Sequence, residues 1–144
     1  MLLGTAKGVS LTGEGLVLPP RFHEGFAEGY VMTRGLDGCV AVFPCETWEI
    51  MRERIELGTT LLMSAARHFH RYLFGGASEE KLGPEGLVPI PEHLRSHAGL
   101  EDEVVLVGVG DRMEIWSPQR WAHEEYRMNE SSLRDSEELS ELGV

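Results

Sequence analysis

A seven-residue segment near the start of the chain recurs 71 residues later. Residues 11–17 read Leu-Thr-Gly-Glu-Gly-Leu-Val and residues 82–88 read Leu-Gly-Pro-Glu-Gly-Leu-Val, so five of the seven positions are identical. Glycine-rich turns between apolar residues are typical of a strand, a tight turn and a second strand. The chain is therefore expected to contain two copies of one supersecondary unit.

The repeat continues beyond this segment in both halves. A Pro-x-x-apolar-basic stretch at residues 19–23 and again at residues 91–95 predicts the start of a short helix. Residues 30–44 and 103–116 each predict a β-hairpin with a Gly/Asp turn, and a helix start follows each hairpin. Neither half, at under about 50 residues, buries much core alone, so the halves are expected to pack on each other or on other subunits.

Apolar residues at helical spacing predict three longer helices. The first covers residues 46–57, and the second begins after a cap at Thr59 or Thr60 and runs to Leu73. Together they are expected to form a helical hairpin that links the two halves. The third covers residues 118 to about 128.

The chain of 144 residues has a formal net charge of -11 at pH 7. Residues 122–144 contain seven acidic residues and two arginines, so they contribute -5, and residues 1–121 contribute -6. This negative charge argues against a protein that coats nucleic acid with a uniformly positive surface. A local basic face is still compatible with it. The serine- and glutamate-rich end predicts a frayed helix or a solvated tail. Its role would be either that of a solubilising terminus or that of a docking helix for a partner.

Several other classes of protein find little support in the sequence. The longest apolar stretches, residues 40–43 and 104–107, are far too short to cross a bilayer, and no secretion signal is visible, so a cytosolic location is expected. Cys39 and Cys45 make neither a disulfide framework nor a four-ligand zinc site, and packing is the expected role of both. No catalytic arrangement is discernible, so neither an enzyme nor a cofactor is expected.

His93 and His97 lie four residues apart on one predicted helix, a spacing that can hold a metal ion. Glu92 is the one candidate for a third metal ligand in this segment. A pair of surface histidines on a helix is therefore the preferred interpretation, and no metal site is predicted.

Four segments together, in order and with matching spacing, resemble the bacterial MraZ family. They are Pro-x-x-Phe-His at residues 19–23, the hairpin run and Trp of residues 33–48, Leu-Arg-x-x-Ala-Gly-Leu at residues 94–100, and Met-Glu-Ile-Trp-Ser-x-x-x-Trp at residues 113–121. The resemblance covers residues 1 to about 125.

The resemblance implies an α+β fold with two tandem AbrB-like swapped-hairpin β half-barrels joined by a helical hairpin. Its parts would be repeat 1 at residues 5–47, linking helices at 48–75, repeat 2 at 77–120, and a C-terminal helix with an acidic tail at 121–144. It also implies a ring-shaped homo-oligomer. MraZ proteins are transcriptional regulators that bind repeated promoter elements ahead of the division and cell-wall gene cluster, and they associate with the nucleoid.

The sequence departs from the family pattern where MraZ repeats carry an Asp-x-x-x-Arg motif, whose arginines form much of the DNA-facing surface. The aligned positions are Thr12 and Leu16 in the first repeat and Gly83 and Leu87 in the second, and a glutamate occupies each turn. Leucine offers phosphate neither charge nor donor, and glutamate repels it, so DNA affinity is expected to be reduced. The double change Leu16→Arg and Leu87→Arg is expected to strengthen DNA binding.

Two functional hypotheses follow from these observations. The first is a DNA-binding regulator that contacts promoter DNA through the remaining basic residues near the expected face, which are Lys7, Arg21, His23, Arg34, Arg95 and His97. The second is an oligomeric ring-forming scaffold or interaction protein that has lost DNA binding. As a DNA face these basic residues are few and interrupted by acids, and an ordinary protein surface is the preferred interpretation of them.

Overall fold

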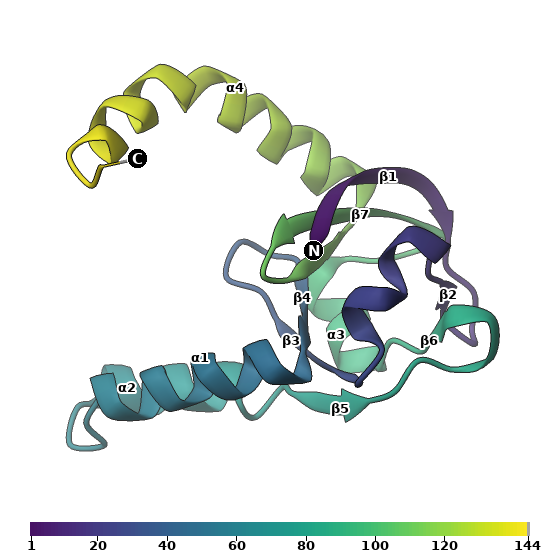
Figure 1. Cartoon of the computed structure of the whole chain (residues 1–144), viewed down its shortest axis with the longest axis horizontal. Coiled ribbons are helices and arrows are strands. Elements are labelled where there is room, and N and C mark those ends of the chain that lie inside the picture. Colours follow the sequence, from purple (N-terminus) through teal and green to yellow (C-terminus); the bar gives the residue numbers. More distant parts are fainter. Residues whose placement is uncertain (144) are drawn as a thin grey trace.

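The computed structural model describes residues 1–143 (Figure 1). Six antiparallel strands form one sheet in the order β1-β7-β8-β4-β3-β5, and β2 and β6 form a separate two-stranded ladder. The strands are β1 Leu2–Ser10, β2 Leu16–Val17, β3 Tyr30–Arg34, β4 Val40–Pro44, β5 Ser78–Glu80, β6 Leu87–Val88, β7 Glu103–Gly110 and β8 Met113–Trp116. The helices are η1 Pro20–Phe22, η2 Glu24–Phe26, α1 Cys45–Gly58, α2 Ser64–Leu73, η3 Pro84–Gly86, α3 Glu92–Ala98 and α4 Pro118–Ser140.

The two halves of the chain interlock by exchanging strands. Strand β1 of the first half pairs with β7 of the second, and β5 of the second half pairs with β3 of the first. The short strands β2 and β6 also pair across the halves. The expectation that the halves pack on each other is confirmed, because the first strand of each half, β1 or β5, pairs with a strand of the other half.

The main core lies between the sheet, the β2–β6 ladder and the short helices. Its largest members, each less than 2 % exposed, come from both halves and include Leu16, Phe22, Tyr30, Leu94 and Leu106. Burial of each such side chain contributes about 1.5–3 kcal/mol, and these contacts cross between the halves. The fold is therefore mixed α+β, with one core shared by both repeats.

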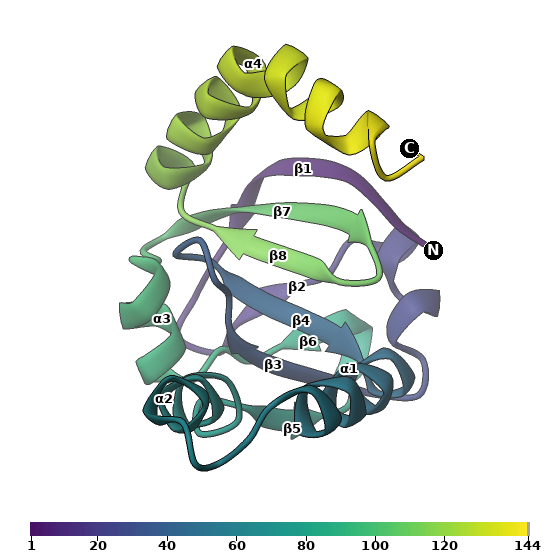
Figure 2. The same cartoon turned by 90° about the vertical axis from the view of Figure 1, so that its left-hand side faces the viewer.

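Helices α1 and α2 lie side by side and extend from one end of the molecule (Figures 1 and 2). A second apolar cluster holds this hairpin to the sheet, with the Trp48 ring 5.6 Å from Phe43 and 5.8 Å from Phe74. The predicted first helix is confirmed to within one residue at each end. The second begins at Ser64, four or five residues after the expected cap at Thr59 or Thr60. The Thr60 hydroxyl instead accepts a hydrogen bond from Leu62 N inside the loop.

Helix α4 is twelve residues longer than predicted. Ser117 caps it by accepting a hydrogen bond from Arg120 N at 3.2 Å. Further on, the Ser131 and Ser136 hydroxyls donate to carbonyls one turn earlier in the helix, at 2.9 and 2.7 Å. The serine-rich stretch is thus helical as far as Ser140. Within residues 1–143 no helix combines the length and the apolar character needed to cross a bilayer.

Candidate nucleic-acid interface

The two turns that carry the expected motif positions come together in space, although they belong to different halves. The first turn is closed by reciprocal backbone hydrogen bonds between Thr12 and Gly15, at 3.0 and 3.1 Å, and leads into β2. The second runs through η3 into β6. Leu16 lies opposite Val88, and Val17 lies opposite Leu87. The four motif positions, Thr12, Leu16, Gly83 and Leu87, therefore lie in or next to the β2–β6 ladder.

The two leucines at the arginine positions of the motif differ in exposure. Leu16 is 1 % exposed and belongs to the main core, whereas Leu87 is only half-buried. This corrects the expectation for Leu16, because its side chain packs inside the protein rather than toward a ligand. Only Leu87 is placed where an arginine could reach solvent.

The surface of these turns carries negative charge. Glu14 and Glu85 are both exposed, and residues 10–18 and 82–91 contain no lysine or arginine. Glu85 adopts a left-handed backbone with φ 58°, which holds its side chain at the tip of its turn. Phosphate is repelled from such a surface, so the turns by themselves make a poor DNA contact.

Lys7 and Arg21 lie at strand β1, and both are exposed. The Arg21 guanidinium donates to the Thr5 carbonyl at 3.3 Å and lies 4.7 Å from the Phe22 ring centroid. The Lys7 ammonium lies 3.7 Å from a carboxylate oxygen of Glu125 in α4. Lys7 thus lies on the edge strand β1, and Arg21, in η1, is held against the same strand.

Arg34 and Arg95 are half-buried, and each is held by a backbone carbonyl. Arg34 donates to Tyr72 O at 2.8 Å, and its guanidinium lies 5.7 Å from the Tyr72 ring. Arg95 donates through Nε to Ile90 O at 2.8 Å. The contacts thus divide the four predicted cations into a pair at β1, Lys7 within it and Arg21 against it, and a pair beside α2 and α3.

Arg120 is a basic residue that sequence reasoning missed. Its Nη1 donates to Gly38 O at 2.9 Å and to His97 O at 2.8 Å, so it ties α4 to the β3–β4 turn and to the end of α3. No local pattern marks it, because its partners are 82 and 23 residues away in sequence. Burial, together with Arg34 and Arg120, lowers the pKa of His97 below its ordinary value.

The predicted histidine pair does not converge on a common point. His93 donates from Nε2 to Gly76 O at 3.0 Å, and His97 Nε2 lies 3.5 Å from the Tyr72 hydroxyl. Among residues 1–143, no three His, Cys, Asp or Glu side chains lie together as metal ligands would. The ring of His23 also contacts a backbone carbonyl, that of Leu18, at 2.6 Å.

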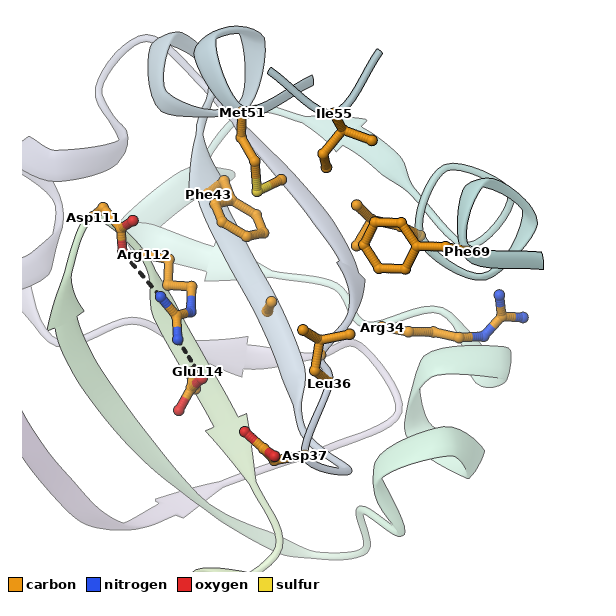
Figure 3. A pocket seen from close by; sticks show the side chains of 13 residues that line it. Arg34, Leu36, Asp37, Phe43, Met51, Ile55, Phe69, Asp111, Arg112 and Glu114 are labelled. Atoms are coloured by element: carbon orange, nitrogen blue, oxygen red, sulfur yellow. Dashed lines mark hydrogen bonds and ion pairs between the residues drawn. The ribbon is translucent and has the colours of Figure 1, made fainter. Parts of the chain in front are cut away.

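An apolar pocket of about 240 Å³ lies between the α1–α2 hairpin and the β3–β4 turn (Figure 3). Phe43, Met51 and Phe69 line it, while Arg112 bridges Asp111 and Glu114 at 3.0 and 3.2 Å on one side. No nucleophile with an adjacent base faces it. The pocket offers apolar contact and no evident chemistry.

The pKa of each of the two cysteine thiols lies above its ordinary value. Burial is the main cause that raises the pKa of both Cys39 and Cys45, and the carboxylates of Glu114 and Glu79 respectively add to it. Cys39 is fully buried beside Trp116, which agrees with the predicted packing role.

Comparison with known proteins identifies the family. The family model for MraZ, described as an antitoxin-like MraZ protein, matches residues 73–141. The Transcriptional regulator MraZ of Heliobacterium modesticaldum is 40% identical over 126 residues, which cover 88% of this chain and 85% of that protein. The proteins of that name from Caldicellulosiruptor bescii and Clostridium acetobutylicum are each 35% identical over the full length of both chains. This chain therefore belongs to the MraZ family.

Proposed function

We propose that this chain is a DNA-binding transcriptional regulator of the division and cell-wall gene cluster, active as a ring-shaped homo-oligomer on repeated promoter elements. The observation that carries this proposal is full-length similarity to relatives named Transcriptional regulator MraZ. The family is not enzymatic, and the pocket geometry gives no reason to assign an activity. The protein would act in the cytoplasm, at the nucleoid when bound to DNA, without a cofactor.

The fold assignment that goes with this function is a pair of AbrB-like swapped-hairpin units at residues 5–47 and 77–120. The exchange of β1 and β5 between the halves supports it, because each half contributes one strand to the hairpin of the other. In this arrangement, the equivalent turns of both units lie on one side of the molecule, around the β2–β6 ladder. Two equivalent turns on one side of the molecule are suited to two equivalent contacts with a DNA duplex.

Lys7, Arg21, Arg34 and Arg95 would supply the contacts with DNA phosphates. Each of the three arginines uses one N–H group on a backbone carbonyl, which orients its guanidinium and leaves other donors for phosphate. The turn acids Glu14 and Glu85 oppose this attraction. The result would be an affinity below that of a relative with arginines at the motif positions.

Leu87→Arg in the full chain tests whether the proposed DNA face includes the turns around the β2–β6 ladder. The new guanidinium would stand beside the β2–β6 ladder, and each added phosphate contact steepens the salt dependence of binding by about 0.9. We expect tighter binding to a duplex that carries the family's direct repeats. Leu62→Arg is the matched control, because Leu62 is 91 % exposed in the α1–α2 loop and gains the same charge elsewhere. Equal effects of both variants would contradict the proposed DNA face.

A scaffold or interaction protein that has lost DNA binding is the second candidate. Two observations favour it: glutamates in both turns, and a group of apolar side chains exposed at the α1–α2 loop, which are Leu57, Leu61, Leu62 and Met63. Apolar groups exposed together mark surfaces for protein contact. Both candidates predict a defined oligomer, but this one predicts no DNA binding even at low salt. Titration of the oligomer with promoter DNA at low salt distinguishes the two.

A further inference from the structure

Helix α4 is fixed to the outer face of the sheet through its first turns. Trp121 is 7 % exposed and packs against Trp116, with ring centroids 5.6 Å apart, and against Val105 and Val107 of β7. Arg120 adds its two hydrogen bonds to Gly38 and His97. The position of the next turn of α4 is therefore set by the body of the protein.

That next turn places Glu125 over strand β1. Residues four apart lie on the same face of a helix, so Glu125 follows Trp121 on the face that looks toward β7 and its neighbour β1. Figure 2 shows α4 above β1, and in Figure 1 the helix starts near β1 before it runs away to the upper left. The acid is thus held near the sheet edge.

Lys7 is brought toward Glu125 by an irregularity in β1. The pairing of β1 with β7 shifts register between Ala6 and Val9, so Lys7 and Gly8 form a bulge, and Gly8 has φ 72°. A bulge turns its side chains away from the regular alternation of a strand. The Lys7 ammonium and the Glu125 carboxylate come within 3.7 Å of each other.

We propose that α4 is an autoinhibitory element in which the Glu125 carboxylate occupies Lys7 in place of a DNA phosphate. This inference rests on the proposed DNA-binding function and adds its regulation. A phosphate would have to displace Glu125 to reach Lys7, and the freed carboxylate would then attract a cation of its own. The contact with Lys7 would therefore yield little net counterion release as long as Glu125 is present.

The rest of α4 strengthens the effect. Beyond Glu125, residues 130–141 add five acids, Glu130, Asp135, Glu137, Glu138 and Glu141, against the single Arg134. In Figure 1 this part of the helix extends away from the sheet. Acids within a Debye length of a bound duplex, about 10 Å at 0.1 M salt, would repel its phosphates, and more distant acids would be largely screened.

The test compares four full-length proteins on one duplex with the family's direct repeats: wild type, Lys7→Gln, Glu125→Gln and the double variant. Glu125→Gln should tighten binding at low salt by about two- to fivefold, the range of an exposed ion pair. It should also steepen the salt slope by about 0.9, because Lys7 now releases a counterion from DNA. Lys7→Gln should weaken binding by a smaller factor in the wild type, where Glu125 competes for Lys7, than in the Glu125→Gln background, where it should remove the whole gain.

Glu124→Gln is the matched control. Glu124 precedes Glu125 on the same helix, carries the same charge and pairs with Arg127 at 3.7 Å instead of with Lys7. It should tighten binding less than Glu125→Gln and leave the salt slope unchanged. A full-length variant with the five acids of residues 130–141 changed to their amides should tighten binding further without altering the dependence on Lys7.

The outcomes separate this inference from the proposed function. Binding by the Glu125→Gln protein that is lost again with Lys7→Gln supports both, even where the wild type binds weakly. If the wild type binds but Lys7→Gln costs the same factor in both backgrounds, or Glu124→Gln equals Glu125→Gln, autoinhibition is overturned and DNA binding stands. If none of the proteins binds the duplex at low salt, the regulator hypothesis is overturned together with its regulation.

Discussion

Leu16 of β2 lies directly opposite Val88 of β6, and this pair joins two turns that are 71 residues apart in sequence. Both side chains are buried, with exposed fractions of 1 % and 4 %. The pair therefore makes the motif region part of the shared core, and not simply a surface for contact with DNA.

Leu16→Arg should destabilise the fold strongly. Truncation of a buried leucine to alanine costs about 2–5 kcal/mol, and an arginine adds an unpaired charge to the same site. Leu87→Arg, at a half-buried position, should cost about 1 kcal/mol or less. Urea unfolding at one fixed protein concentration measures both, and equal free energies of unfolding for the two variants would contradict the burial of Leu16.

Trp121 anchors α4, so Trp121→Ala should lower the free energy of unfolding by about 3–5 kcal/mol. Trp121→Phe should cost less than about 1.5 kcal/mol, because the ring packing is mostly kept and the buried indole N–H has no hydrogen-bond partner among the described residues. Thermal unfolding of the two variants makes the comparison. A large loss of unfolding free energy in the Trp121→Phe variant would contradict the account, because it would indicate that the indole N–H makes a hydrogen bond.

Arg120→Met should weaken the attachment of α4 by about 1–2 kcal/mol. It removes two hydrogen bonds from a charged donor to backbone carbonyls, but the residue is exposed, which reduces their value. Arg127→Met is its control, since Arg127 forms an exposed ion pair with Glu124, and its loss should change stability by less than about 0.5 kcal/mol. Amide exchange in α4 should accelerate in the first variant alone.

Stability should fall as the pH is lowered through the titration of His97. Its pKa is lowered in the folded protein by burial and by Arg34 and Arg120, so between that value and the unfolded value of 6.5 the unfolded chain binds more protons. Stability contributed by neutral His97 is therefore present above pH 6.5 and lost as the pH falls through the folded pKa. His97→Gln should flatten the pH dependence of unfolding in this range, and an unchanged slope would assign the loss to other groups.

The repeat and the helical spacing were sufficient to predict the order of elements in each half and the bounds of α1. They could not predict that β1 pairs with β7, because a strand pattern marks its own buried face and does not name its hydrogen-bond partner. The two-residue strand β2 is too short for alternation to show that Leu16 points inward. The full length of α4 was missed because its serines give a loop-like composition, whereas their hydroxyls bond within the helix.

The candidate interface was predictable in part. Sequence comparison between the halves located the two turns, and the structure brings them together around β2 and β6. The pairing of Lys7 with Glu125 spans 118 residues and depends on a bulge in one element and a helix face in another. No local pattern in the sequence encodes that juxtaposition.

Under the proposed function, this protein binds promoter repeats through a small number of phosphate contacts. The claim is tested by equilibrium binding of the full chain to a duplex with intact direct repeats, and to one with scrambled repeats, between about 0.05 and 0.2 M salt. We predict tighter binding to the intact repeats, with affinity that falls linearly in a logarithmic plot against salt. No binding to either duplex at the lowest salt, or equal binding to both, would contradict the claim.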